Sequence, residues 1–215
     1  MRIGIDIDDT TFLTYKYMLK YADIFENEIS GVPVNKDNFG LIKNCYYLNT
    51  LYGWDDKTKS DFFNKYYKMV LEECTILPYA KEVINKLKEE GNTIHFITAR
   101  IMNIENCDAE AITKNSLNKF GVLYDSLNLQ IKDKCSFMKD NDIDLLIDDS
   151  YDICKEVTSK GEKALLMKTK LNERIDDSNI IRVSDWNEIY SFIHNNFWLF
   201  WKMQPKVYII SNSTV

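Results

Sequence analysis

Short apolar segments that end in a polar residue recur along this chain, separated by segments with helical spacing. The clearest have the length and β-branched content of buried strands: residues 2–7 (RIGIDI), 93–98 (TIHFIT) and 143–147 (IDLLI), with weaker ones near 127–131 and 163–167. The helical segments are expected at about 80–90, 109–119, 135–141 and 151–159. A glycine closes three of them, as is common at helix ends. This alternation predicts an α/β fold, a Rossmann-like parallel sheet covered by helices.

The interval 11–77 breaks the alternation. It contains helical patterns at about 12–29 and 57–74, and it is too long for a simple strand-to-helix connection. We therefore expect a small helical cap inserted after the first strand, at residues 11–77. The predicted core is residues 1–10 and 78–196, and residues 197–215 form a tail whose structure the sequence does not predict.

Composition narrows the class of protein. The 215 residues are 45% apolar, and the net charge of −6 argues against a surface for polymeric nucleic acid. Five cysteines without a C-x-x-C pair are typical of reduced thiols. Acidic residues stand where a signal peptide needs an apolar core, and the longest apolar run, 197–201, is too short to span a bilayer. We expect a cytoplasmic protein without membrane contact.

Four groups of polar residues follow the predicted strands or lie just beyond them. They are Asp6-Ile7-Asp8-Asp9-Thr10, Thr98-Ala99-Arg100, Lys134, and Asp148-Asp149. Taken singly, each has an ordinary explanation, such as a helix cap or a surface lysine. In an open parallel sheet, however, ligands bind at the carboxyl ends of the strands. The ordered combination therefore indicates one site.

These residue types suit phosphoryl transfer. One carboxylate of the Asp6 and Asp8 pair can attack phosphorus, and the other can exchange protons with the leaving oxygen and with water. Oxygen ligands favour Mg²⁺, for which Asp148 would join Asp6 and the backbone carbonyl of Asp8. The hydroxyl of Thr98 and the backbone amides that follow it, with Lys134, would bind the phosphoryl oxygens.

The four groups resemble, in order, the motifs of the haloacid dehalogenase superfamily. Asp6, Asp8 and Thr10 match the first motif, D-x-D-x-T, and Thr98 matches the second. Lys134 matches the third motif, for which Lys132 is the alternative, and Asp148-Asp149 match the fourth. The resemblance implies that Asp6 is the nucleophile and Asp8 the acid/base. It also implies that Asp6, Asp8 and Asp148 bind Mg²⁺, and that Asp149 acts through water.

The strings FITAR, DLLIDDSYDIC and DWNEIY are similar to those of the 5'(3')-deoxyribonucleotidase group and its bacterial nucleotidase relatives. This resemblance implies a phosphoric monoester hydrolase, with a nucleoside monophosphate as its substrate. Phe12 and Tyr15, which are nearest in sequence to the nucleophile, are candidates to contact the leaving group by stacking. Arg100 would contact the phosphate or pair with a carboxylate.

Three alternatives stay open at this point. The same chemistry would serve a sugar phosphate or another small metabolite, because the cap selects the leaving group. A phosphotransferase would move the phosphoryl group instead of releasing it. An inactive ligand-binding module is disfavoured by the intact set of polar residues. The sequence leaves the oligomeric state, including a homo-oligomer, open.

Overall fold

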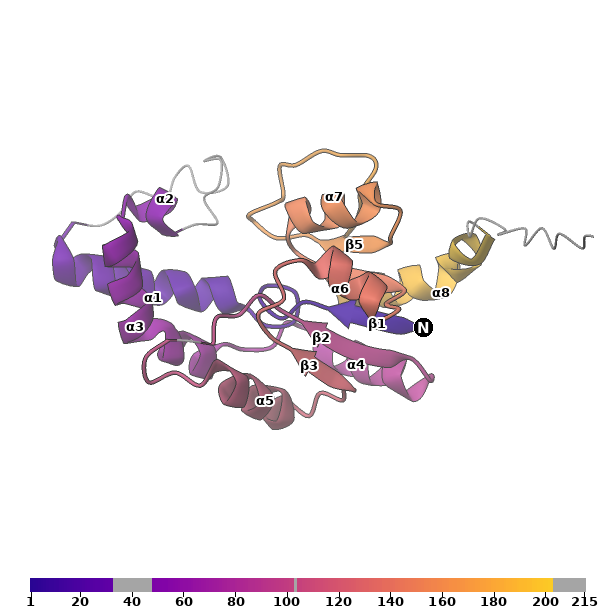
Figure 1. Cartoon of the computed structure of the whole chain (residues 1–215), viewed down its shortest axis with the longest axis horizontal. Coiled ribbons are helices and arrows are strands. Elements are labelled where there is room, and N and C mark those ends of the chain that lie inside the picture. The colour runs from indigo at the N-terminus through magenta and orange to yellow at the C-terminus, as the bar shows by residue number, and fades with distance from the viewer. Residues whose placement is uncertain (33–47, 103, 203–215) are drawn as a thin grey trace, which may run out of the picture.

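The computed structural model describes residues 1–32, 48–102 and 104–202, with side chains up to residue 195. Its centre is a parallel sheet of six strands in the order β3-β2-β1-β4-β5-β6 (Figure 1). The strands are β1 (Arg2–Ile5), β2 (Thr93–Ile97), β3 (Ser126–Asn128), β4 (Leu145–Asp148), β5 (Ala164–Met167) and β6 (Ile181–Val183). The predicted α/β fold with a parallel sheet is confirmed.

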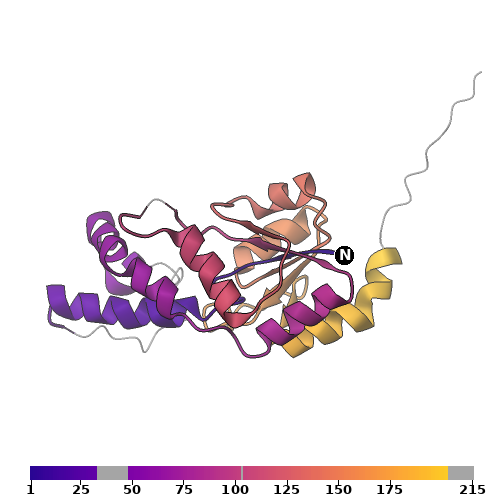
Figure 2. The ribbon, with the colours of Figure 1, turned by 90° about the horizontal axis from the view of Figure 1, so that it is seen from below.

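Helices cover both faces of this sheet. The helices of the described residues are α1 (Thr14–Ile29), α2 (Leu48–Tyr52), α3 (Asp56–Glu73), α4 (Ala80–Glu89), α5 (Ala109–Phe120), α6 (Lys134–Asp140), α7 (Tyr151–Ser159) and α8 (Trp186–Lys202). Helices α4 and α8 lie side by side on one face (Figure 2). Helices α6 and α7 pack together on the other, where α7 contacts β4 and β5.

The side chains of the central strands point alternately to the two faces of the sheet, and this produces the two layers of helices. Ile3 and Ile5 of β1 point into a core that includes Ile84 of α4 and Ile189 of α8. Leu146 of β4 points the other way, into a core with residues of α6 and α7. Successive side chains of a strand point to opposite faces, so strands covered on both sides are apolar throughout. The polar side chains of a site are then expected at the ends of the strands or just beyond them.

The sheet includes one close approach that requires glycine. A Cβ placed on Gly4 would lie 2.7 Å from Cδ1 of Ile97 and 3.1 Å from Cγ2 of Ile143. We expect Gly4→Ala to lower the free energy of unfolding by about 1–3 kcal/mol through overpacking, measured by urea denaturation. Ile97→Val removes the clashing methyl group, so the double variant should be less destabilised than the sum of the single variants. Simple additivity would contradict this explanation.

The segment between β1 and α4 leaves and rejoins the sheet at adjacent points. The backbone N–H of Leu13 donates to the carbonyl of Thr75 (2.9 Å), and that of Leu77 donates to the carbonyl of Thr11 (2.8 Å). Beyond this pair of connections, α1 and α3 pack against each other to the left of the sheet in Figure 1. Residues 33–47 of the expected cap lie outside the described residues.

Most aromatic side chains in the described part of this segment form a core of their own. Phe25, Trp54, Phe62 and Tyr66 are buried together, with ring centroids 5.2–6.2 Å apart for the contacting pairs. Aromatic pairs at such distances stabilise a fold beyond the area they bury. The helical spacing of Phe62 and Tyr66 in α3 therefore reflects packing and not ligand binding.

Three elements were not predicted from the sequence. Helix α2 and strand β6 are short, with five and three residues. Helix α8 begins within the expected core and continues through residue 202, so that the first residues of the expected tail are helical, whereas residues 203–215 lie outside the described residues. Trp186, Ile189 and Ile193 are all buried, at the spacing of one helix face, a signal that was present in the sequence.

Candidate active site

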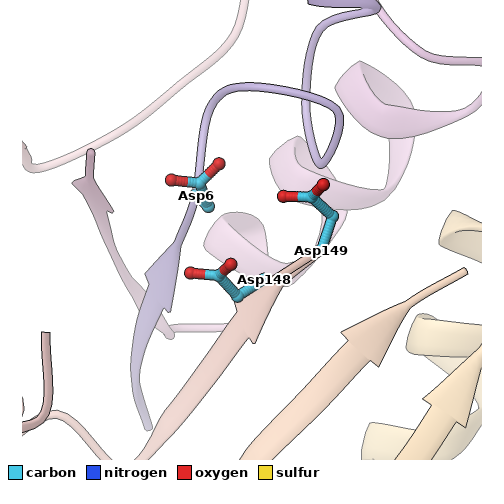
Figure 3. Close-up of side chains that lie close together, drawn as sticks. All are labelled: Asp6, Asp148 and Asp149. Atoms are coloured by element: carbon cyan, nitrogen blue, oxygen red, sulfur yellow. The ribbon is translucent and has the colours of Figure 1, made fainter. Parts of the chain in front are cut away.

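The polar residues after β1 and β4 meet because these two strands are neighbours. Ile5 pairs with Ile147, and the backbone N–H of Asp6 donates to the carbonyl of Ile147 at 2.9 Å. Asp148, the last residue of β4, therefore lies beside Asp6 (Figure 3). This is the carboxyl edge of the sheet, where the sequence analysis expected the site.

Three carboxylates converge at this edge. Asp6, Asp148 and Asp149 each place one oxygen within 4.8 Å of the other two (Figure 3). Asp6 and Asp148 are 6% and 1% exposed. Neither Asp148 nor Asp149 caps helix α7, because Ser150 does so, accepting a hydrogen bond from the backbone N–H of Ile153. Oδ1 of Asp148 accepts from the backbone N–H of Ser150 at 2.8 Å, and both carboxylates lie close to Asp6.

Lys134 neutralises part of this charge. Its ammonium group donates to Oδ1 of Asp6 and, at 2.6 Å, to Oδ2 of Asp148. Burial lowers the pKa of Lys134, but the two carboxylates outweigh burial, and the net shift is upward. Lys132, the alternative for the third motif, is exposed, whereas Lys134 is 3% exposed. The structure brings Lys134, and not Lys132, to Asp6.

Thr98 and Ala99 follow β2 on the other side of β1. Thr98 is buried, and its hydroxyl oxygen accepts from the backbone N–H of Arg100 at 3.2 Å. Helix α5 begins at Ala109 and has Asp108 as its N-cap, so Thr98 does not cap this helix. Ala99 is exposed, and both residues line the same cavity as Asp6. Their position fits the phosphate-binding role predicted for them.

Asp8 is paired with Arg100. Its carboxylate accepts from Nη2 at 2.7 Å and from Nε at 3.0 and 3.1 Å. Burial raises the pKa of Asp8, but the guanidinium outweighs burial and holds it below its usual value. Of the two roles predicted for Arg100, the structure therefore shows pairing with a carboxylate, and the guanidinium is not a free cation in the cavity.

The loop after Asp6 is held from several directions. The hydroxyl of Thr11 donates to the carbonyl of Asp6 at 2.8 Å, and the indole N–H of Trp186 donates to the carbonyl of Thr10 at 2.9 Å. Asp9 has a positive φ of 55° and accepts from the backbone N–H of Tyr15, the second residue of α1. The loop is thereby fixed to both the core and the first helix of the inserted segment.

A cavity of about 590 Å³ opens above these residues. Its lining includes Asp6 and Lys134 and also, from the core, Ile101, Ile104 and Ile153. The lining residues from the inserted segment are Thr14, Tyr15, Met18, Leu48, Asn49, Asp56, Lys59, Ser60, Phe63 and Tyr67. Such a mixture of apolar and polar groups is typical of small-molecule sites.

Tyr15 and Phe12, both predicted to contact the leaving group, differ in their placement. Tyr15 lines the cavity, and it also lines a neighbouring cavity of about 710 Å³. Phe12 does not line either cavity: it is fully buried and packs edge-to-face on Phe120, with ring centroids 5.7 Å apart. The prediction for Phe12 is wrong because the chain turns back after Asp8, where the N–H of Phe12 donates to the carbonyl of Ile7.

Sequence reasoning missed several residues that support the site. Thr113 of α5 accepts from Nη1 of Arg100 at 2.7 Å. Asn172 is buried and donates from Nδ2 to the carbonyl of Asp149 at 2.7 Å. Trp186 belongs to the string DWNEIY, which offered a signal, whereas Thr113 and Asn172 lie in unremarkable local sequence. Their roles depend on tertiary neighbours.

Comparison with known proteins gives relatives over almost the whole chain. No protein-family model matches. Nucleotidase CA_C3379 of Clostridium acetobutylicum is 29% identical over 198 residues, which are 92% of this chain and 95% of that protein. The protein named "Putative nucleotidase YqfW" of Bacillus subtilis is 27% identical over 203 residues, 91% of this chain and 95% of that protein.

Solved structures agree at the level of the fold. A haloacid dehalogenase-like family hydrolase from Streptococcus pneumoniae superimposes with a TM-score of 0.63 at 15% identity, covering 89% of this chain and 97% of that chain. The chain has a haloacid dehalogenase-like fold. The β-phosphoglucomutase of Clostridium difficile shares it, with a TM-score of 0.64 at 14% identity over 94% of this chain and 98% of that chain.

These comparisons confirm the resemblance drawn from the sequence motifs. The relatives named nucleotidase, with neighbours of haloacid dehalogenase-like fold named hydrolase, support the prediction of a phosphoric monoester hydrolase. The two solved structures carry different names on one fold, so the fold alone does not identify a substrate. Among the described residues, no helix has the length and apolar character needed to cross a bilayer.

The charges of the site fit a bound divalent cation. Burial raises the pKa of Asp6 to about 7, with the charges of Asp148 and Asp8 acting in the same direction against Lys134. Burial, and then the charge of Asp148, also raise the pKa of Asp149 well above its usual value. The carboxylates therefore destabilise one another's ionised forms, and a nearby cation reverses that effect. Converging oxygen atoms are the donors that Mg²⁺ prefers.

Proposed function

We propose that this protein is a magnesium-dependent phosphomonoester hydrolase that uses Asp6 as a covalent nucleophile. The observation that carries the proposal is the convergence of Asp6, Asp148 and Asp149 in the lining of a cavity, with Lys134 bonded to Asp6 and Asp148. Asp6 and Asp148, the backbone carbonyl of Asp8, and Asp149 through water would hold the metal. When bound, Mg²⁺ neutralises charge on the phosphoryl oxygens and aligns them for attack.

In the first step, a carboxylate oxygen of Asp6 attacks phosphorus, and the bond between phosphorus and the ester oxygen breaks. Asp8 donates a proton to the departing oxygen, which leaves as an alcohol. Asp8 must therefore take up a proton when the substrate binds, and the negative charge of the phosphate favours this because it opposes the effect of Arg100 on the pKa of Asp8. The hydroxyl of Thr98 and the Lys134 ammonium stabilise the phosphoryl oxygens during attack. In the second step, Asp8 takes a proton from water, which attacks phosphorus and releases inorganic phosphate from Asp6.

We further propose nucleoside monophosphates as the substrates. Two lines of support are the names of the relatives and the aromatic lining of the cavity by Tyr15, Phe63 and Tyr67. An aromatic ring that stacks on a nucleobase contributes about 1–3 kcal/mol. In this proposal residues 11–77 form a cap over the site, and it is the cap that selects the leaving group.

Phosphate release tests this function directly. Ribo- and deoxynucleoside monophosphates, sugar phosphates and an aryl phosphate would be compared with Mg²⁺ and with EDTA. We expect release that EDTA abolishes and that added Mg²⁺ restores, because the carboxylates repel a phosphate dianion without a cation. The highest kcat/KM should fall on nucleoside monophosphates. A preference for sugar phosphates would keep the mechanism and reject the substrate, and phosphate transfer without release would indicate a phosphotransferase.

A further inference from the structure

Arg100 is buried behind the carboxylate of Asp8, and its N–H groups are engaged by protein atoms. Nε and Nη2 contact both oxygens of Asp8 at 2.7–3.1 Å, while Nη1 donates to the hydroxyl of Thr113 at 2.7 Å. Nη2 also lies 3.4 Å from the hydroxyl of Thr14, the first residue of α1. The planar guanidinium thus contacts Asp8 at two points, which fixes the orientation of the carboxylate as well as its position.

The far side of the guanidinium is anchored in helix α5. Thr113 is fully buried, and its hydroxyl donates to the carbonyl of Ala109 at 2.6 Å while it accepts from Arg100. The hydroxyl of Thr113 therefore donates its proton within the helix, and its oxygen accepts the hydrogen bond from Nη1. Asp8 is in this way connected through Arg100 to a rigid helix of the core.

Arg100 and Asp8 differ in their exposure to solvent. The side chain of Arg100 is 1% exposed, whereas that of Asp8 is 35% exposed. Asp8, Arg100 and Thr98 line the same cavity. The carboxylate therefore presents accessible atoms to the cavity while the guanidinium supports it from the protein side.

We infer that Arg100 is a positioning residue: with Thr113, it holds the Asp8 carboxylate in the orientation needed for proton exchange with the ester oxygen. This inference rests on the proposed hydrolase function, and it goes beyond the two roles that the sequence left open for Arg100, which were contact with the phosphate and pairing with a carboxylate. It predicts that loss of Arg100 impairs the same step as loss of Asp8. That step matters most when the leaving oxygen is a poor leaving group that needs a proton.

Two esters with different leaving groups test the inference. The leaving group of a nucleoside 5'-monophosphate is an alkoxide, which needs a proton. The leaving group of p-nitrophenyl phosphate is a phenolate, which is stable without one. The quantity to compare is kcat/KM, because it reports the step in which the leaving group departs. For Arg100→Lys and Thr113→Val we expect losses of about tenfold to hundredfold on the nucleotide, within the range of general acid catalysis, and far smaller losses on the aryl ester.

Asp8→Asn shows how the two esters respond when the proton donor itself is lost. The decisive comparison is between Asp8→Asn alone and Asp8→Asn combined with Arg100→Lys. If Arg100 acts through Asp8, Arg100→Lys should reduce kcat/KM little further once Asp8 is Asn. Thr158→Val is the matched control for Thr113→Val, because its hydroxyl makes the equivalent bond to the carbonyl four residues earlier in α7. We expect this control to keep wild-type kcat/KM on both esters.

Other outcomes would overturn the inference. Equal losses on both esters from Arg100→Lys and Thr113→Val, additive with Asp8→Asn, would indicate a general structural role. A raised KM for both esters at unchanged kcat would indicate contact with the phosphate. A wild-type protein that hydrolyses neither ester would contradict the proposed function itself, which separates that failure from a failure of the positioning role. If Arg100→Lys does not fold, Thr113→Val still decides the question.

Discussion

Asp6→Asn should reduce kcat on a nucleoside monophosphate by about 10⁴- to 10⁶-fold, the scale of loss when a catalytic nucleophile is removed. The amide has nearly the shape of the carboxylate but lacks the negative charge needed to attack phosphorus. Its hydrogen bond with Lys134 can persist through the amide oxygen, so we expect a folded protein. Phosphate release and thermal unfolding of the same preparations would measure the two effects.

Trapping the covalent intermediate makes this prediction specific. Acid quenching of the wild-type protein during turnover of a ³²P-labelled substrate should leave label on the protein, in a bond that hydroxylamine cleaves. Asp6→Asn should carry no label. Asp140→Asn removes the same charge from the exposed end of α6 and serves as the control. Labelling of Asp6→Asn at the wild-type level would show that another residue is the nucleophile.

Lys134→Met should produce the largest loss of stability among single substitutions at the site. Lys134 is the buried cation that contacts both Asp6 and Asp148, and its removal leaves two buried carboxylates without that partner. Breaking a buried ion pair by removal of one member costs about 3–5 kcal/mol. We therefore expect a decrease of this size in the free energy of unfolding, measured by urea denaturation in EDTA.

Added Mg²⁺ should recover part of this loss, because a ligand that binds only the folded state stabilises it. Lys132→Met is the matched control: Lys132 is exposed, and its replacement should change stability by less than about 0.5 kcal/mol. Equal effects of the two substitutions would contradict the buried ion-pair network. In activity assays, Lys134→Met should also lower kcat, since the ammonium is proposed to stabilise the phosphoryl oxygens.

The parts of the site that the sequence predicts are those that depend on strand ends. Asp6 and Asp148 follow apolar segments of strand length, and parallel strands bring their carboxyl ends to one edge. Their proximity therefore follows from secondary structure and strand order, with few tertiary details. For the third motif the sequence offers Lys134 and, as the alternative, Lys132; the burial of Lys134 at the start of α6 distinguishes it from the exposed Lys132.

The parts that were missed depend on the direction in which a side chain points. Phe12 is close to Asp6 in sequence, but a tight turn after Ile7 sends its ring into the core. The sequence left two roles open for Arg100, because the residues around it do not show that Thr113 of helix α5 lies behind its guanidinium.

The two connections between the core and residues 11–77 have an evolutionary consequence. Since Thr11 and Leu77 are joined by a backbone hydrogen bond of 2.8 Å, the inserted segment begins and ends at nearly the same point. The entropic cost of closing a loop between fixed points grows only slowly with the length of the loop. Segments of other sizes and sequences could therefore be exchanged at this junction during evolution, changing the compound that is recognised while the carboxylates at the sheet edge stay in place.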